Sequence, residues 1–225
     1  MGPPFFKICC IAAVAEAEMA IAAGASAIGL VGPMPSGPGT IDRRTIADVA
    51  SAVEGRIKRF LLTSETSIDA LVAELASVDV DVVQLVDRID GSLAELRERA
   101  DVAEIVQVVH VEGPQAVDAA REAAEHADAI LLDSGRPFAD AKGGIRELGG
   151  TGRVHDWTVS RRVVEAVEVP VLLAGGLRPE NVADAVADTR AAGVDVCSGV
   201  RVDGALDATL LTRFAANAGA AFRAL

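Results

Sequence analysis

The sequence predicts an α/β protein, a single-domain (β/α)8 TIM barrel over residues 1–225, and three observations lead there. The chain has 225 residues, close to the roughly 250 that such a barrel typically needs. Short aliphatic runs alternate with Ala-rich amphipathic stretches along its whole length, without a linker or a shift of composition. Aromatic residues make up only 3%, and an aliphatic core suits parallel strands that are buried on both faces.

The alternation defines each expected element. The expected strands are Phe5–Cys10, Ala27–Val31, Lys58–Leu62, Asp81–Gln84, Ala103–His110, Ala129–Leu132, Val171–Ala174 and Val194–Cys197. The expected helices span residues 12–23, 42–53, 67–76, 92–99, 114–126, 156–166, 181–189 and 207–223. Residues typical of helix N-caps stand at five of their starts: Asp42, Ser67, Ser92, Asp156 and Asn181. An open doubly wound sheet is the alternative, but the glycine fingerprint after its first strand is missing.

Charge and cysteine content limit the partners and the compartment. The net charge of −12 argues against a nucleic-acid or anionic-membrane partner, because phosphate contacts need clustered Lys and Arg. The first residues lack a signal peptide, and no apolar run approaches the ~18 residues of a membrane span. Three cysteines are too few for a secreted disulfide framework. We therefore expect a cytoplasmic protein with reduced thiols, either a monomer or a homodimer.

The first expected strand carries the first candidate for chemistry. Side chains alternate along a strand, so Lys7 and Cys9 share one face while Ile8 and Cys10 share the other. An apolar Ile8 belongs against the helices, which turns Lys7 and Cys9 toward the barrel interior. A nearby cation favours the thiolate, which then serves as a general base. The alternative is that the cysteines are small buried hydrophobes, the usual state of this residue.

Two carboxylates lie at or near the carboxyl ends of other strands, where barrel enzymes place their chemistry. Asp133 follows four apolar residues and no helix begins directly after it. Partial burial raises the pKa of such a carboxyl and makes it a usable general acid. Asp195 has the inward parity of Cys197 and is expected to bond a sugar hydroxyl. His110 ends a strand and could face the site, but the histidines lack metal-ligand spacing, so no metal is expected.

Glycines end the last two strands and also occupy the long loop over residues 133–155. The loops after strands seven and eight of a barrel frequently hold a phosphate through backbone N–H groups. Glycine lets the backbone close on such an anion, because it has no side chain. We therefore expect a substrate and phosphate site that includes Lys7, Gly150, Gly175, Gly176, Ser198 and Gly199.

Together these segments resemble the phosphoribosylanthranilate isomerase family of tryptophan biosynthesis. The segments that carry the resemblance are Lys7–Cys9, Gln84–Leu85, Leu131–Asp133, Gly149–Gly152, Asp156–Trp157, Ala174–Leu177, Pro179–Val182 and Val194–Val200. The resemblance implies Cys9 as general base and Asp133 as general acid in an Amadori rearrangement of a phosphorylated sugar amine. It assigns Gly175, Gly176, Ser198 and Gly199 to the phosphate, and it implies no cofactor.

The sequence also departs from the family pattern. Cys10 stands where the family has Gly, and Arg201 stands where it has Glu. Val86–Asp87 replaces a Gly-containing segment. The loop after the second strand has no positive charge over residues 32–41, whereas the family pairs an Arg there with the anthranilate carboxylate, often a strong bidentate contact. Arg43, Arg44 or Arg136 would have to replace that Arg.

Three functions follow from these observations. The first is phosphoribosylanthranilate isomerase activity through a divergent site. The second keeps the acid–base mechanism and changes the substrate to another phosphorylated sugar amine or sugar phosphate. The third is a non-catalytic protein that binds a phosphorylated ligand, which gives no reason for a thiol and a carboxyl at the strand ends.

Overall fold

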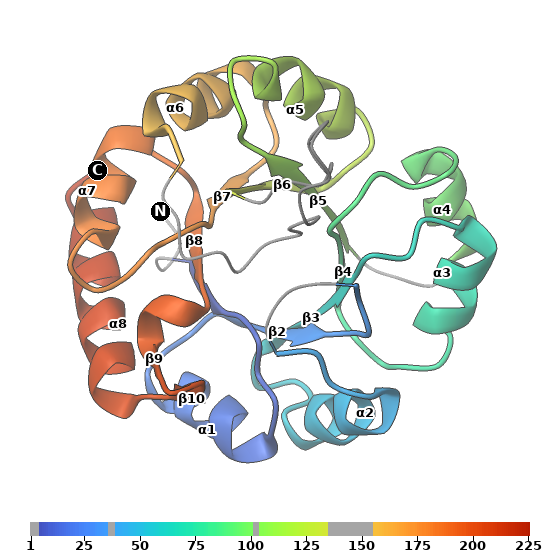
Figure 1. The fold of residues 1–225 in the computed structure, drawn as a ribbon, viewed down its shortest axis with the longest axis horizontal. Coiled ribbons are helices and arrows are strands. Elements are labelled where there is room, and N and C mark those ends of the chain that lie inside the picture. Colours follow the sequence, from blue (N-terminus) through green and yellow to red (C-terminus); the bar gives the residue numbers. More distant parts are fainter. Residues whose placement is uncertain (1–4, 36–38, 101–103, 135–154) are drawn as a thin grey trace.

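The computed structural model describes residues 5–35, 39–100, 104–134 and 155–225. Eight strands close into one barrel, in which each strand pairs with its neighbours in sequence and β8 pairs with β1. All of these pairings are parallel, and helices surround the strands on the outside (Figure 1). The prediction of a (β/α)8 barrel is confirmed.

The elements lie close to their predicted positions. The barrel strands are β1 Phe5–Ile8, β2 Ala27–Val31, β3 Lys58–Thr63, β4 Val82–Leu85, β5 Glu104–His110, β6 Ala129–Asp133, β7 Val171–Leu173 and β8 Gly193–Val196. The helices are α1 Val14–Ala22, α2 Arg43–Ala52, α3 Ile68–Leu75, α4 Leu93–Arg99, α5 Ala116–Ala124, α6 Trp157–Ala166, α7 Val182–Thr189 and α8 Ala208–Arg223. A 3-10 turn η1 Ser198–Val200 and a small hairpin, β9 Arg201–Val202 with β10 Ala205–Leu206, follow β8 and were not predicted.

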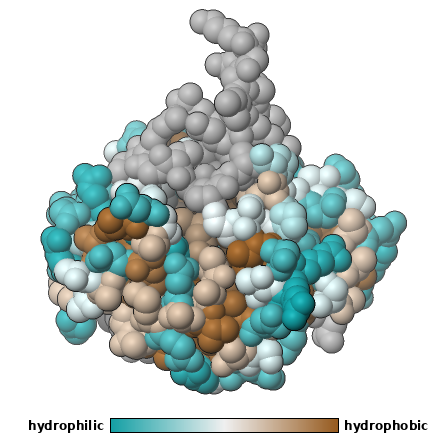
Figure 2. Space-filling model, turned by 60° about the horizontal axis from the view of Figure 1, so that its bottom comes forward, coloured by the Kyte–Doolittle hydropathy of each residue, from teal (hydrophilic) through white to brown (hydrophobic). Residues whose placement is uncertain are grey.

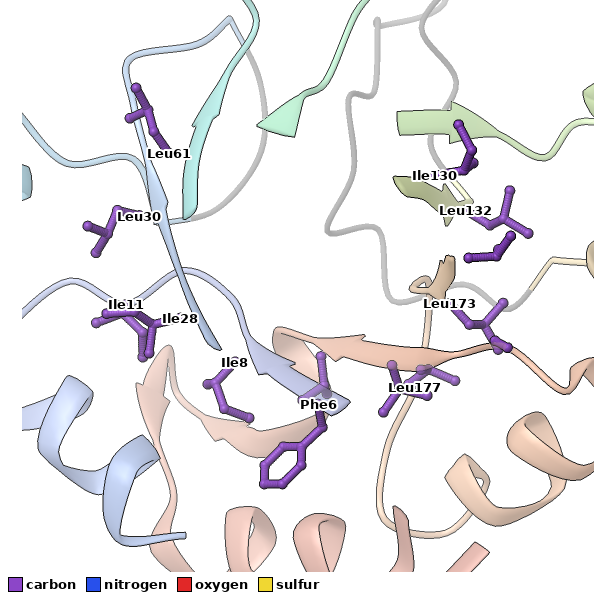
Figure 3. Packing of buried hydrophobic residues seen from close by; sticks show 14 of the residues in the cluster. Phe6, Ile8, Ile11, Ile28, Leu30, Leu61, Ile130, Leu132, Leu173 and Leu177 are labelled. Carbon is purple, nitrogen blue, oxygen red and sulfur yellow. The ribbon is translucent and has the colours of Figure 1, made fainter. Parts of the chain in front are cut away.

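The buried side chains form two layers that follow the alternation of each strand. On the outer side, hydrophobic residues pack against the helices, among them Phe6, Ile8, Ile28 and Leu30 (Figure 3). On the inner side, a smaller cluster contains Cys9, Phe60, Leu62 and Leu131, among others. The sequence therefore reads as continuous aliphatic runs because both faces of these strands are buried.

Three of the five predicted helix caps are confirmed. The side chains of Asp42, Ser92 and Asp156 accept hydrogen bonds from backbone N–H groups in the first turn of α2, α4 and α6. Ser67 precedes α3 without a side-chain cap. Asn181 also does not cap α7, because its Oδ1 accepts from the N–H of Arg178, on the preceding loop. Both residues stand at the predicted N-cap position, but neither side chain makes a capping hydrogen bond, and for Asn181 the loop competes for the side chain.

The described surface mixes hydrophilic and hydrophobic residues. On the face in Figure 2, hydrophilic residues dominate both flanks, and hydrophobic residues form smaller groups between them. Among the described residues, only Val14, Val202 and Leu225 are large hydrophobic side chains that are exposed. No described helix has the length and apolar character that a membrane crossing requires.

Candidate active site

A buried ion pair between the first and last strands lies inside the barrel. Lys7 is fully buried, and its Nζ lies 2.9 Å from Oδ1 of Asp195. The two residues are direct neighbours in the register of β1 and β8. Burial alone would lower the pKa of Lys7, but the Asp195 carboxylate and Cys9 outweigh burial and raise it above its ordinary value. Lys7 is therefore a fixed positive charge beneath the barrel mouth.

Cys9 lies directly beyond β1 and faces the interior, as predicted. It is buried, and Gly29 of β2 gives it room. A Cβ on Gly29 would lie 3.0 Å from Sγ of Cys9 and 3.0 Å from Nζ of Lys7. Because any larger residue at position 29 crowds both groups, the sequence Ala-Ile-Gly of β2 helps to bring the thiol and the ammonium together.

Cys10 does not lie where strand alternation predicts. It was expected to share the helix-facing side with Ile8, but it packs in the inner cluster with Cys9. The reason is its backbone: φ is 62°, in the left-handed region that an L residue rarely adopts. The chain turns there, and Sγ of Cys10 comes within 2.7 Å of Sγ of Cys197, just after β8. A Gly at this position would adopt the same conformation without strain.

Arg201 holds this turn in place from the other side. Its Nη2 donates to the carbonyl oxygens of Cys10 at 2.6 Å and Cys9 at 3.3 Å. Its Nη1 donates to Oε1 of Glu16 at 2.7 Å and to the Gly204 carbonyl at 3.0 Å. Glu16 is bound in turn by the N–H of Ala12. The sequence around Arg201 does not predict this role, because the residues that Arg201 binds are mostly distant from it in sequence.

Asp133 ends β6 and is buried, with its side chain toward the interior like that of Leu131. Its Oδ1 accepts a hydrogen bond of 2.8 Å from the N–H of Ser134. Burial raises the pKa of the Asp133 carboxyl, which is the direction that a general acid requires. His110 of β5 is its neighbour in the register, so His110 also reaches the barrel mouth. The ring Nε2 of His110 lies 3.0 Å from the Val86 carbonyl oxygen.

The loops after β7 and β8 pack closely against each other. Gly175 and Gly176 both have positive φ, 83° and 65°, which makes a tight turn that other residues would strain. Asn181 fixes the turn, because its Nδ2 donates to the Gly176 carbonyl at 3.0 Å. A Cβ on Gly199 would overlap the Leu177 carbonyl group. Ser198 lies between these features and is exposed.

Sequence reasoning missed two residues that lie against Gly175. A Cβ on Gly175 would lie 3.0 Å from Oγ of Ser134 and 3.1 Å from Nδ1 of His155. The ring Nε2 of His155 is 2.7 Å from Oγ of Ser160. Burial lowers the pKa of His155 to about 4, so the imidazole is neutral at pH 7. Its position directly before the cap of α6 was the signal that pointed to it.

Comparison with known proteins identifies the family. The profile described as "N-(5'phosphoribosyl)anthranilate (PRA) isomerase" matches residues 7–217. The chain is 35% identical to the N-(5'-phosphoribosyl)anthranilate isomerase of Haloarcula marismortui over 214 residues, which cover 94% of each protein. The chain belongs to the N-(5'-phosphoribosyl)anthranilate isomerase family. Members of this family are isomerases, and the resemblance inferred from the sequence is confirmed.

Solved structures with this family's name have the same fold. That of Thermotoga maritima matches with a TM-score of 0.79 at 25% identity, covering 96% of this chain and 99% of that one. A second, at 23% identity and a TM-score of 0.76, covers 96% and 99%. It is described as a complex with reduced 1-(o-carboxyphenylamino)-1-deoxyribulose 5-phosphate.

The arginines that could bind an anthranilate carboxylate differ in their surroundings. Arg43 and Arg44 are exposed on α2, and Arg44 pairs with Asp48 at 3.9 Å. Arg201 is occupied by Glu16 and the backbone. Arg136, the third candidate to replace the family's Arg, and Gly150 of the predicted phosphate site lie outside the described residues.

Proposed function

We propose that this protein catalyses the Amadori rearrangement of N-(5'-phosphoribosyl)anthranilate to the 1-deoxyribulose 5-phosphate product, in the cytoplasm, as a monomer or homodimer. One observation carries the proposal. Cys9 and Asp133 both project inward at the carboxyl ends of their strands, with the two glycine loops of β7 and β8 between them around the barrel. This arrangement supports acid–base catalysis on a substrate anchored at its phosphate end.

The chemistry needs one acid and one base. Asp133, whose pKa burial raises, protonates the ring oxygen so that the furanose opens to a Schiff base. Cys9, whose side chain lies beside the Lys7 ammonium, then acts as the base and removes the proton from C2. The resulting enolamine tautomerises to the ketose amine. The base lies at the end of β1 and the acid at the end of β6, so both groups can address one substrate in the barrel mouth.

The phosphate end of the substrate is proposed to bind at Gly175, Gly176, Ser198 and Gly199, with Gly150 from the preceding loop. Their support is the turn geometry, in which successive left-handed glycines leave backbone N–H groups without side chains over them. The neutral His155 beside Gly175 has one ring nitrogen without a partner among the described residues. It is a further donor for this site. Asp195 is proposed to contact a sugar hydroxyl while its Oδ1 stays paired with Lys7.

A second candidate function keeps this mechanism and changes the group attached to the sugar. It is favoured by the loop after β2, where Gly32–Ile41 contains no Lys or Arg. The described arginines nearest in sequence to this loop are exposed on α2. A substrate without a carboxylate on its amine substituent would need no cation there.

Steady-state kinetics on N-(5'-phosphoribosyl)anthranilate test the proposal. We expect turnover by the wild type, and a loss of kcat on the order of 10²–10⁴-fold in Cys9→Ser and Asp133→Asn. Cys10→Gly is the matched control, because it removes the neighbouring thiol and fits the left-handed backbone. Rescue of a tryptophan auxotroph by both site variants would contradict the assignment. A folded wild type without turnover would favour the second candidate, which a panel of other phosphoribosyl amines would then test.

A further inference from the structure

Two thiols outside the proposed acid–base pair meet at the barrel mouth. Cys10 follows β1 and Cys197 follows β8, 187 residues apart in sequence, and their Sγ atoms are 2.7 Å apart. A disulfide bond is roughly 2.05 Å long and requires closely placed backbones. Here the backbones already hold the two sulfur atoms side by side, so bond formation needs only a small side-chain movement.

A side chain at position 10 strains the backbone and also needs space that a neighbouring loop provides. Cys10 has φ of 62°, a conformation that glycine adopts at least cost. Gly39, from the loop after β2, lies directly over it, and a Cβ there would be 2.5 Å from Cβ of Cys10. A Gly at position 10 would relieve the backbone strain and would remove the need for a Gly at position 39. That a Cys stands there despite both constraints points to a use for its thiol.

The partner thiol is the more accessible of the two. Cys197 is partly exposed, so a small oxidant reaches it. The contact with Cys10 and the positive charge of Arg201 lower the pKa of Cys197, although burial opposes them. A thiolate near Arg is the form of cysteine that attacks oxidants. Cys10 is buried beside it in position to complete the reaction.

We propose that Cys10 and Cys197 form a redox-active pair that a peroxide-class oxidant converts into an intramolecular disulfide. The Cys197 thiolate attacks hydrogen peroxide, forming a sulfenic acid and releasing hydroxide. The Cys10 thiol then attacks that sulfur, and the S–S bond forms with release of water. In total, two thiols and one peroxide give one disulfide and two waters. Thiol reductants reverse the reaction by exchange.

The bond would tie the carboxyl end of β1 to that of β8. Cys9 and Ser198 are the adjacent residues in sequence, so the link lies between the proposed base and the proposed phosphate loop. Cys9 lies beside Lys7 and Gly29, and its side chain also contacts that of Cys10, so the test must separate a Cys10–Cys197 bond from one that uses Cys9. The inference does not depend on which substrate the protein uses.

Thiol counting on the full chain tests the proposal. The reduced protein is treated with hydrogen peroxide, denatured, alkylated with iodoacetamide and measured by intact mass. We expect the number of alkylated cysteines to fall from three to one, with a peptide that joins residues 10 and 197, and to return to three after dithiothreitol. Three alkylated cysteines after oxidation, or a bond that uses Cys9 or a second molecule, would overturn the proposal.

Variants separate the pair from the third cysteine. Cys9→Ser is expected to lose both of its remaining thiols on oxidation, since the pair is intact. Cys10→Gly and Cys197→Ser are expected to form no intramolecular disulfide. Cys10→Gly relieves the left-handed strain, so a folding defect does not confuse its result. Disulfide formation at an unchanged rate in Cys10→Gly would also overturn the assignment.

Discussion

Replacing Arg201 with Met is expected to loosen the turn that carries Cys9. The substitution removes the guanidinium that binds two backbone carbonyls and Glu16, and it keeps a side chain of comparable length. The carbonyls of Cys9 and Cys10 then lose their donor. Glu16 keeps only its backbone donors, at Ala12 and Leu206.

The size of the effect follows from burial. Breaking a fully buried ion pair costs about 3–5 kcal/mol, while a hydrogen bond to a charged group contributes about 1.5–3 kcal/mol. The side chains of Arg201 and Glu16 are 10% and 18% exposed, so solvent screens the pair in part. We therefore expect the free energy of unfolding to fall by about 2–3 kcal/mol. The free energy of unfolding of Arg201→Lys should lie between those of the wild type and Arg201→Met, because one ammonium cannot donate to all of these acceptors.

Urea unfolding of the wild type and of Arg201→Met as a function of pH measures this loss of unfolding free energy. Burial alone would raise the pKa of Glu16, but Arg201 and the Ala12 N–H outweigh it and hold the pKa below its ordinary value. A lowered carboxyl pKa stabilises the fold above about pH 4.3, and the stabilisation is lost as the pH falls through the folded value. The difference between wild type and variant must therefore shrink in acid. A difference under about 0.5 kcal/mol at pH 7, or one independent of pH, would refute the reasoning.

Three further predictions concern the interior of the site. Lys7→Met leaves Asp195 buried without its cation and should reduce the free energy of unfolding by about 3–5 kcal/mol, measured by urea titration; unchanged stability would contradict the ion pair. Gly29→Ala places a Cβ 3.0 Å from both Cys9 and Lys7 and should lower kcat about tenfold or more, with wild-type kcat as the contrary result. His155 has a lowered pKa, so its stabilisation is present above pH 6.5 and is lost as the pH falls toward about 4. His155→Gln should remove the part of the pH dependence of the melting temperature that falls between these pH values. The same dependence in the wild type and His155→Gln would contradict this role of His155.

The fold was predictable because its signal is local and repeated. Each aliphatic run between amphipathic stretches marks one strand, and eight of them without interruption fit only a few architectures. The inward orientation of Lys7 and Cys9 followed from alternation in the same way. Alternation failed at Cys10, because it holds only while the backbone stays extended and that residue is left-handed.

The residues missed at the site are held by contacts between distant segments. Arg201 binds Glu16 and the backbone of Cys9, and no local pattern links these positions. The place of His155 against Gly175 likewise depends on how two loops pack. Residue type and strand ends reveal which groups are available for chemistry, while their supports become visible only in three dimensions.

The Lys7–Asp195 pair has a consequence for the order of events as the chain is made. Lys7 is synthesised long before its counter-ion, Asp195, which lies 188 residues later in the chain. An ammonium buried without that carboxylate costs several kcal/mol, so the first strand gains little from docking until residue 195 is available. Closure of the ring and completion of the proposed site thus coincide in one step. Fragments that end before β8 should leave their first strand accessible to proteases.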